Sequence, residues 1–204
     1  MRKVASALAL LMAVAVATTG CDPDDLPTPH RNEIDVNTPK LVQAKQDAGI
    51  EDCVPGTGAH VDGGLPALTL PCLGGGPDVD LSALRGPMLV SLWAYWCEQC
   101  RDEMPILQRF HETYGGQVPL LGVDYLDPQV GGAMALMAET GATYPSVADP
   151  YGDLSAQSPL PVIRGLPYLL FVDRNGVVTH IKPGPVDSQQ ELVDLVQQHL
   201  GITL

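Results

Sequence analysis

The stretch "LVSLWAYWCEQCRDEMPIL", residues 89–107, decides the fold of this chain. It begins inside a continuous apolar run over 88–95, which is typical of a strand buried on both faces of a parallel sheet. After that run, apolar residues recur at helical spacing as far as Gly115, which predicts an amphipathic helix. Cys97 and Cys100 therefore stand where a buried strand passes into a helix.

The rest of the chain is predicted to build a sheet and its covering layers around this unit. The predicted elements are, in chain order, a short helix over 38–50, an edge strand over 67–73, a helical turn over 81–84, a strand over 118–127, a helix over 128–141, a short strand over 146–148, a hairpin over 168–184 and a helix over 187–200. Strands joined by helices and completed by an antiparallel hairpin predict an α/β fold with a mixed central sheet covered on both faces.

The position of the two cysteines favours redox chemistry. A cysteine at the start of a helix is favoured as a thiolate, because unpaired N–H groups and the positive end of the helix dipole lie there. Cys97 is the predicted nucleophile, and Cys100 can attack the resulting mixed disulfide to release the reduced substrate. Zinc is disfavoured, because the chain has no second Cys-x-x-Cys and its five histidines are scattered singly. Haem attachment would need histidine where Arg101 stands, and a purely structural disulfide stays open.

This segment resembles the active-site segment of the TlpA/ResA family of extracytoplasmic thiol-disulfide oxidoreductases. The matching residues are two tryptophans, the two cysteines, an acid and a proline: Trp93, Trp96, Cys97, Cys100, Glu103 and Pro105. The likeness runs from about Leu65 to the C-terminus. It includes "GLPYLLFVDRNGVV", residues 165–178, which is similar to the family segment where a cis-proline precedes a strand. The resemblance implies a thioredoxin-like fold, a mixed central sheet flanked by helices with an N-terminal strand and loop extension.

The resemblance also implies roles for particular residues. Cys97 and Cys100 are the expected catalytic pair, and Pro167 is the expected cis-proline facing Cys97. Glu103 is the expected proton acceptor for Cys100, and its alternative is a solvated acid on the helix surface. Substrate contact is expected at Leu166, Pro167 and Trp96, although packing is an equal alternative for Trp96. No dissociable cofactor and no metal is needed.

Two departures from the family pattern bear on the direction of electron flow. Gln99 stands where family members often carry proline, and Ser91 stands where thioredoxin has an aspartate. The negative charge of Glu98 beside Cys97 is expected to oppose thiolate formation, against the helix dipole. The sequence therefore leaves the reduction potential open.

The N-terminal segment has the organisation of an export signal. Residues 1–20 have a basic start, then an apolar core too short to span a bilayer, then small residues before Cys21. This order resembles a lipoprotein signal peptide, in which Cys21 is lipidated; the alternative is an ordinary cleaved signal peptide. An acidic, proline-rich linker is predicted over 21–40, followed by the thioredoxin-like domain over 41–204 with its N-terminal extension over 41–66.

Export also bears on the remaining cysteines. With Cys21 assigned to the lipid, the chain has two pairs, so Cys53 and Cys72 are predicted to form a structural disulfide outside the cytoplasm. The alternative is a third redox thiol at Cys72. The formal net charge of −13 repels phosphate backbones and disfavours nucleic-acid binding.

These features predict a lipid-anchored disulfide reductase at the outer face of the cytoplasmic membrane, or a periplasmic one. The expected partners are disulfide-containing extracytoplasmic proteins, with apocytochrome c as one candidate, and a membrane electron donor. One alternative is a peroxiredoxin-like peroxidase, although that needs threonine three residues before the nucleophile, where Ala94 stands. The other is a non-catalytic binding module of thioredoxin fold.

Overall fold

A mixed five-stranded sheet forms the centre of the chain in the computed structural model, which describes residues 33–204. Its strands are, in spatial order, β5 (Ser146–Asp149), β4 (Leu120–Tyr125), β3 (Met88–Trp93), β6 (Tyr168–Val172) and β7 (Val178–Pro183). The first three run parallel to one another, β6 is antiparallel to β3, and β7 is antiparallel to β6, with which it forms a hairpin. This arrangement confirms the predicted mixed, thioredoxin-like sheet and makes β3 its central strand.

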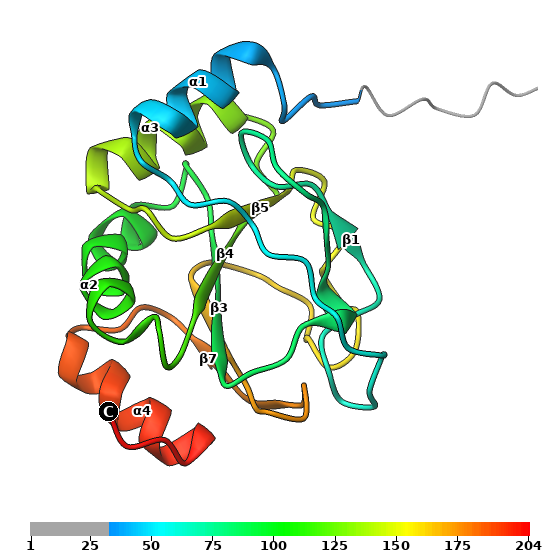
Figure 1. The fold of residues 1–204 in the computed structure, drawn as a ribbon, viewed down its shortest axis with the longest axis vertical. Helices are drawn as coiled ribbons and strands as arrows, with labels where there is room; N and C mark the ends of the chain where they lie inside the picture. The colour runs from blue at the N-terminus through cyan, green and yellow to red at the C-terminus, as the bar shows by residue number, and fades with distance from the viewer. Residues whose placement is uncertain (1–32) are drawn as a thin grey trace, which may run out of the picture. The chain divides into compact units, whose positions relative to one another are not determined.

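The α-helices of residues 33–204 all pack on one face of this sheet, as Figure 1 shows. They are α1 (Pro39–Asp47), α2 (Glu98–Tyr114), α3 (Val130–Thr140) and α4 (Gln189–Leu200). The chain passes from β3 through α2 to β4, and then from β4 through α3 to β5, so that each connection leads from the centre of the sheet toward the same edge. Because such crossovers are right-handed, both connecting helices lie on the same side. Both faces are covered, as the sequence predicts, but by different kinds of structure.

The second face is covered by the N-terminal extension and by loops. The extension reaches beyond the predicted 41–66 as far as Ala83, and this added part contains a small separate sheet of β1 (Thr69–Leu70) and β2 (Val79–Asp80), and a short 3-10 helix over Leu81–Ala83. Of the predicted edge strand over 67–73, only Thr69–Leu70 forms a strand, and it lies outside the five-stranded sheet. The residues after it run along the edge of β5, where Ala148 N–H donates to the carbonyl of Pro71 and Leu73 N–H donates to the carbonyl of Ser146. A disulfide with an S–S distance of 2.06 Å joins Cys53 to Cys72 at this edge.

Alternation along the strands divides the core between the two faces. On β3, Leu89 and Trp93 face the helices, whereas Val90 and Leu92 face the extension. The same period of two runs through β6, and every residue of β3 and β4 is buried. The continuous apolar runs that predicted buried strands are explained by this double-sided core.

Capping residues mark the boundaries of the helices. The hydroxyl of Thr38 accepts a hydrogen bond from Leu41 N–H, with Pro39 in the first turn, and Ser188 caps α4 through Glu191 N–H. Gly141 ends α3 in a left-handed conformation with φ of 71°, which glycine adopts without a Cβ clash.

The packed part of the chain begins at Ile34 rather than at residue 41. Val36 is buried, and its carbonyl accepts a hydrogen bond from Gly74 N–H, so the end of the predicted linker over 21–40 belongs to the packed unit. Apolar Ile34 and Val36 explain this difference, because they join the core on the helical face. The predicted signal over 1–20 and Cys21 lie outside the described residues. Within 33–204, no helix combines the length and hydropathy that crossing a bilayer requires.

Candidate active site

Cys97 and Cys100 form a disulfide at the start of α2, with an S–S distance of 1.98 Å. Cys97 is the N-cap residue, and its Sγ accepts a hydrogen bond from Cys100 N–H at 3.1 Å. This N–H group, together with the positive end of the helix dipole, stabilises negative charge on the sulfur in the reduced form. Cys97 is 6% exposed and Cys100 is completely buried, so only Cys97 offers an approach to a substrate.

The loop between β3 and α2 is held in place by residues that follow β4. The backbone N–H of Tyr95 donates to Asp127 Oδ2 at 2.7 Å, and Asp127 Oδ1 accepts from Gln129 N–H at 2.8 Å. The indole Nε1–H of Trp96 donates to the carbonyl of Leu126 at 3.2 Å. Trp96 is nevertheless 49% exposed, so its ring forms part of the surface beside Cys97.

Two acids of this region were not anticipated from the sequence. Asp127 is fully buried beneath the loop, and Asp124 is fully buried on β4 beside Trp93. Burial, followed by the charge of Asp127, raises the pKa of Asp124 well above its ordinary range. The sequence did contain a signal for these two acids, because both lie at the carboxyl end of a predicted buried strand. In open α/β sheets, the carboxyl ends of the strands commonly contribute residues to functional sites.

Glu103 lies one turn after Cys100 on α2 and is 2% exposed, which excludes the solvated alternative. Its Oε1 accepts a hydrogen bond from Val186 N–H at 2.9 Å. Burial raises the pKa of Glu103 to about 7, partly offset by the bond from Val186 and the charge of Lys182. A carboxyl group with this pKa can take up or release a proton at neutral pH.

A hollow of about 320 Å³ opens beside Glu103. Its lining comes from the exposed side of α2 and from the segment before α4: Gln99, Asp102, Glu103, Ile106, Pro185, Val186 and Asp187. Because Gln99 and Asp102 are exposed, the hollow links the buried carboxyl to solvent. Protons can therefore reach Glu103 without passing through the apolar core.

The peptide bond between Leu166 and Pro167 is cis. Tyr168, the next residue, pairs with Leu92 near the end of β3, which places the proline at the same end of the sheet as Cys97. The carbonyl of Pro167 accepts a hydrogen bond from Gly184 N–H at 2.9 Å, and Leu166 is partly buried against both core clusters. The Gly86-Pro87 and Ser158-Pro159 bonds are also cis, and neither was predicted.

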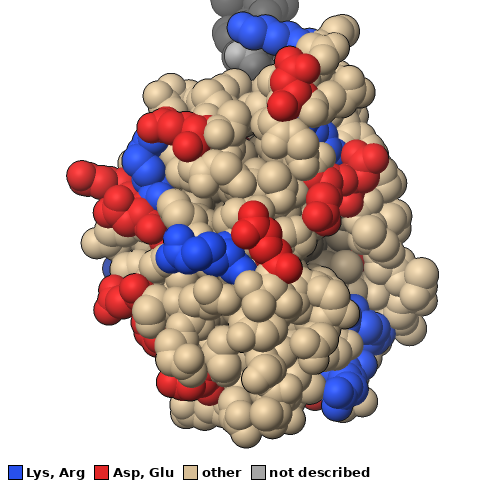
Figure 2. Space-filling view, turned by 60° about the vertical axis from the view of Figure 1, so that its left-hand side comes forward, with Lys and Arg blue, Asp and Glu red and all other residues tan. Residues whose placement is uncertain are grey.

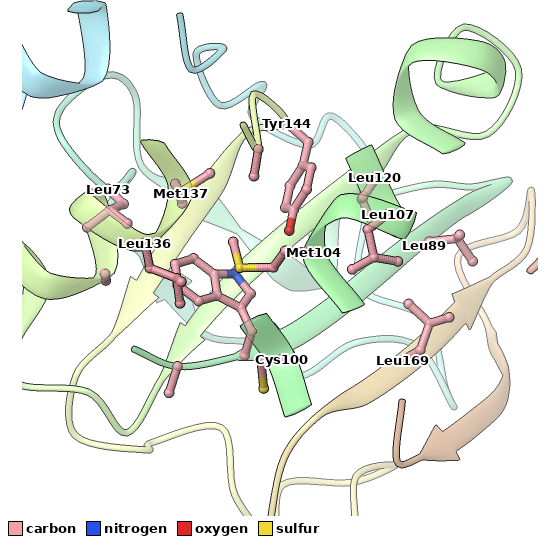
Figure 3. Close-up of a cluster of buried hydrophobic side chains, with 14 of the residues drawn as sticks. Leu73, Leu89, Cys100, Met104, Leu107, Leu120, Leu136, Met137, Tyr144 and Leu169 are labelled. Atoms are coloured by element: carbon pink, nitrogen blue, oxygen red, sulfur yellow. The ribbon is translucent and has the colours of Figure 1, made fainter. Parts of the chain in front are cut away.

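The interior behind the disulfide is apolar. Figure 3 shows Cys100 at the border of a cluster that contains Met104 and Leu107 of α2 and Leu136 and Met137 of α3. Trp93 is 1% exposed and belongs to this core. Ser91, at the position where thioredoxin carries an aspartate, is buried, and its hydroxyl has no partner in the described chain.

The surface around the helices carries both signs of charge. Figure 2 shows carboxylates spread over this face, with lysine and arginine side chains between them. No large basic patch is visible on this face, which agrees with the acidic composition of the chain. Recognition of a polyanion therefore has no electrostatic support on the face shown.

The chain matches one protein-family model and is similar to proteins named for thiol-disulfide exchange. The model of the AhpC/TSA family matches residues 61–181, which include both cysteines and Pro167. The thiol:disulfide interchange protein DsbE of Pseudomonas fluorescens biotype C is 32% identical over 125 residues, covering 60% of this chain and 66% of that protein. The thiol-disulfide oxidoreductase ResA of Geobacillus kaustophilus is 30% identical over 124 residues, covering 59% and 65%.

A solved structure agrees with the sequence relatives. The structure of MTB DsbF in mixed oxidized and reduced forms matches with a TM-score of 0.56 at 28% identity, covering 65% of this chain and 94% of that one. The match to DsbE and ResA spans slightly less than two thirds of the length of those relatives. The resemblance expected from the active-site segment is thereby confirmed at the level of family and fold.

Proposed function

Because the chain belongs to the AhpC/TSA family, we propose that it is an extracytoplasmic thiol-disulfide oxidoreductase that acts through Cys97 and Cys100. The main observation behind this proposal is the disulfide at the N-terminus of α2. Cys97 is the more exposed of its two cysteines, and Cys97 Sγ accepts a hydrogen bond from Cys100 N–H. The names of the relatives, which describe disulfide interchange, support the same chemistry.

The proposed reaction is the reduction of a protein disulfide. The thiolate of Cys97 attacks one sulfur of the substrate disulfide, whose S–S bond breaks as the other substrate sulfur leaves with the electron pair and takes a proton. Cys100, deprotonated, then attacks Sγ of Cys97 in the mixed disulfide and releases the second substrate sulfur as a thiolate. Two electrons pass to the substrate, and the Cys97–Cys100 disulfide remains to be reduced again.

Neighbouring residues have assignable tasks in this cycle. Glu103, with its pKa near neutrality and its link to solvent, accepts the proton of Cys100 before the second attack. The exposed ring of Trp96 and the backbone of Leu166 before cis-Pro167 offer a surface for the substrate chain at the end of the sheet that carries Cys97.

The two alternatives have less support. A peroxidase of the peroxiredoxin type needs threonine three residues before its nucleophile. This chain has Ala94 there, a buried residue of the loop before α2. An inert binding module leaves unexplained a buried acid with a pKa of about 7 one turn from Cys100. The names of the relatives describe thiol-disulfide exchange, and they refer neither to peroxide reduction nor to a non-catalytic binding role.

Measuring the reduction potential of the Cys97–Cys100 pair tests the proposed direction. We expect a potential near that of thioredoxin, about −270 mV, as determined by equilibration with a dithiol redox buffer and alkylation of the two cysteines. A potential near that of a strong oxidant, about −120 mV, would instead make the protein a donor of disulfides. In that second case, the protein should also fail to reduce insulin under the same conditions.

We also propose that Cys21 anchors the protein to the outer face of the cytoplasmic membrane. The small residues before Cys21 and the apolar core of the signal support lipidation, and two acyl chains hold a protein stably at a bilayer. The proposed partners are a membrane electron donor and disulfide-containing exported proteins, including apocytochrome c. The relatives named for disulfide interchange support such substrates.

Replacing Cys21 tests the anchor. The wild-type chain should fractionate with membranes and gain the mass of a diacylglyceryl group, whereas Cys21→Ser should carry no lipid and lose firm attachment to the membrane. Recovery of Cys21→Ser in the membrane fraction at the wild-type level, after a high-salt wash, would contradict a lipid anchor at this residue.

A further inference from the structure

The second disulfide, Cys53–Cys72, has a polar environment on one of its two sulfurs. Lys45 Nζ lies 3.4 Å from Cys72 Sγ, and the backbone N–H of Cys53 lies 3.3 Å from the same sulfur. Cys53 Sγ instead lies 3.3 Å from the carbonyl oxygen of Ser146. Two donors thus face one sulfur and an acceptor faces the other.

Lys45 is held in this position by other contacts. Its side chain extends from α1 and is 5% exposed, and its Nζ donates to the carbonyl of Gly75 at 2.6 Å and to Asp52 Oδ1 at 2.8 Å. The side chain of Asp52 is 79% exposed, so the counter-charge that the described residues provide for the buried ammonium is a solvated one. Burying an ammonium group is costly, and a disulfide that serves only as a staple gains little from one.

The same arrangement suits the reduced form of the pair. When the S–S bond is cleaved, one sulfur leaves as a thiolate, and a cation with an N–H donor stabilises that charge at Cys72. The carbonyl of Ser146 can accept the S–H of a neutral thiol at Cys53 but would repel a thiolate there. The asymmetry parallels that of the active-site pair, where Cys97 Sγ receives the N–H of Cys100.

The geometry points to Cys53–Cys72 as a second exchange-active disulfide, in which a dithiol attacks Cys53 and Cys72 leaves as a thiolate stabilised by Lys45. This assignment is independent of the function proposed for Cys97 and Cys100. It gives the N-terminal extension a redox chemistry of its own, carried out on the outer edge of β5.

The reaction is balanced with the dithiol as the reductant. One of its thiolates forms a bond to Cys53 Sγ, the Cys53–Cys72 bond breaks, and the electron pair of that bond goes to Cys72. The second thiol of the reductant gives up its proton and attacks the mixed disulfide, and Cys53 leaves and takes a proton. Two electrons are transferred, and the reductant becomes a cyclic disulfide.

Cys53 is the more approachable of the two sulfurs. It is 3% exposed and lies in a segment without regular structure, next to Val54, which is 74% exposed, whereas Cys72 is completely buried and paired with Val147. Its neighbour Asp52 lines a hollow of about 420 Å³ and another of about 580 Å³. We take this exposed loop as the side from which a thiolate attacks Cys53.

Equilibration with reduced and oxidised dithiothreitol tests the role of Lys45. We expect Lys45→Met to need about a tenfold higher ratio of reduced to oxidised reagent for half-reduction of Cys53–Cys72, which corresponds to about 30 mV. Lys40→Met, on the exposed side of the same helix, should match the wild type. Differential alkylation with peptide mapping reads the two disulfides separately, and Cys97–Cys100 should titrate equally in all three proteins. An unchanged or lower ratio in Lys45→Met would overturn the proposal.

The site of attack is tested on the wild-type chain, which removes any dependence on the folding of a variant. Brief exposure to 2-mercaptoethanol, with iodoacetamide present to trap the thiolate that leaves, should place the mercaptoethanol adduct on Cys53 and the alkyl group on Cys72. The reverse distribution, or no modification of either cysteine while Cys97 reacts, would overturn the assignment.

Discussion

Replacing Cys97 with serine should lower the rate of insulin reduction by on the order of 10³-fold or more, because the serine hydroxyl is not a nucleophile for disulfides at neutral pH. Cys97 is the sulfur that combines exposure with the hydrogen bond from Cys100 N–H. The measurement is insulin turnover with dithiothreitol as the electron source, made on full-length protein in detergent. Cys21→Ser provides a matched control, since it also exchanges one cysteine for serine, and its turnover should equal that of the wild type.

Replacing Cys100 with serine should have a different consequence. Attack by Cys97 still occurs, but no second thiol releases the substrate, so a mixed disulfide accumulates at Cys97 and mass spectrometry should detect it. The absence of such an adduct, combined with loss of turnover, would argue against the order of attack proposed above. Wild-type turnover in Cys97→Ser would remove the thiol mechanism altogether.

Replacing Glu103 with glutamine should stabilise the protein at alkaline pH while slowing its reaction. The pKa of Glu103 is raised from 4.5 to about 7, so the unfolded chain releases this proton at lower pH than the folded chain does. The free energy of unfolding therefore falls as pH rises between about 4.5 and about 7, by roughly 3 kcal/mol in total, and the loss is complete above that window. Glutamine cannot ionise, and its side-chain oxygen can still accept from Val186 N–H.

The comparison requires urea unfolding at several pH values. Glu103→Gln should resemble the wild type near pH 4 and exceed it by up to roughly 3 kcal/mol near pH 8. Turnover should fall by roughly tenfold to a hundredfold at pH 7, because Cys100 loses its proton acceptor. Asp102→Asn neutralises the adjacent, exposed acid of the same helix and should leave both properties close to those of the wild type. Parallel stability curves for Glu103→Gln and the wild type would contradict the raised pKa.

Local patterns in the sequence determined much of the fold. The apolar run over 88–95 indicated a strand buried on both faces, which the structure forms over Met88–Trp93, and the helical spacing after Cys97 indicated a helix with one apolar face. Capping residues such as Thr38 and Gly141 set the ends of helices, because their effects act within one turn. The pairing of Cys97 with Cys100 is equally local, since both belong to one turn.

The tertiary structure alone decided which polar residues are buried and what they face. Val186 is 83 residues from Glu103 in the chain, Tyr95 is 32 residues from Asp127, and Lys45 is 27 residues from Cys72. Sequence spacing marks such residues as polar, but their ionisation and hydrogen bonding depend on desolvation by segments that only the complete fold brings together. The cysteines were therefore found from the sequence, whereas the groups that control their protons and charges became visible only in the assembled molecule.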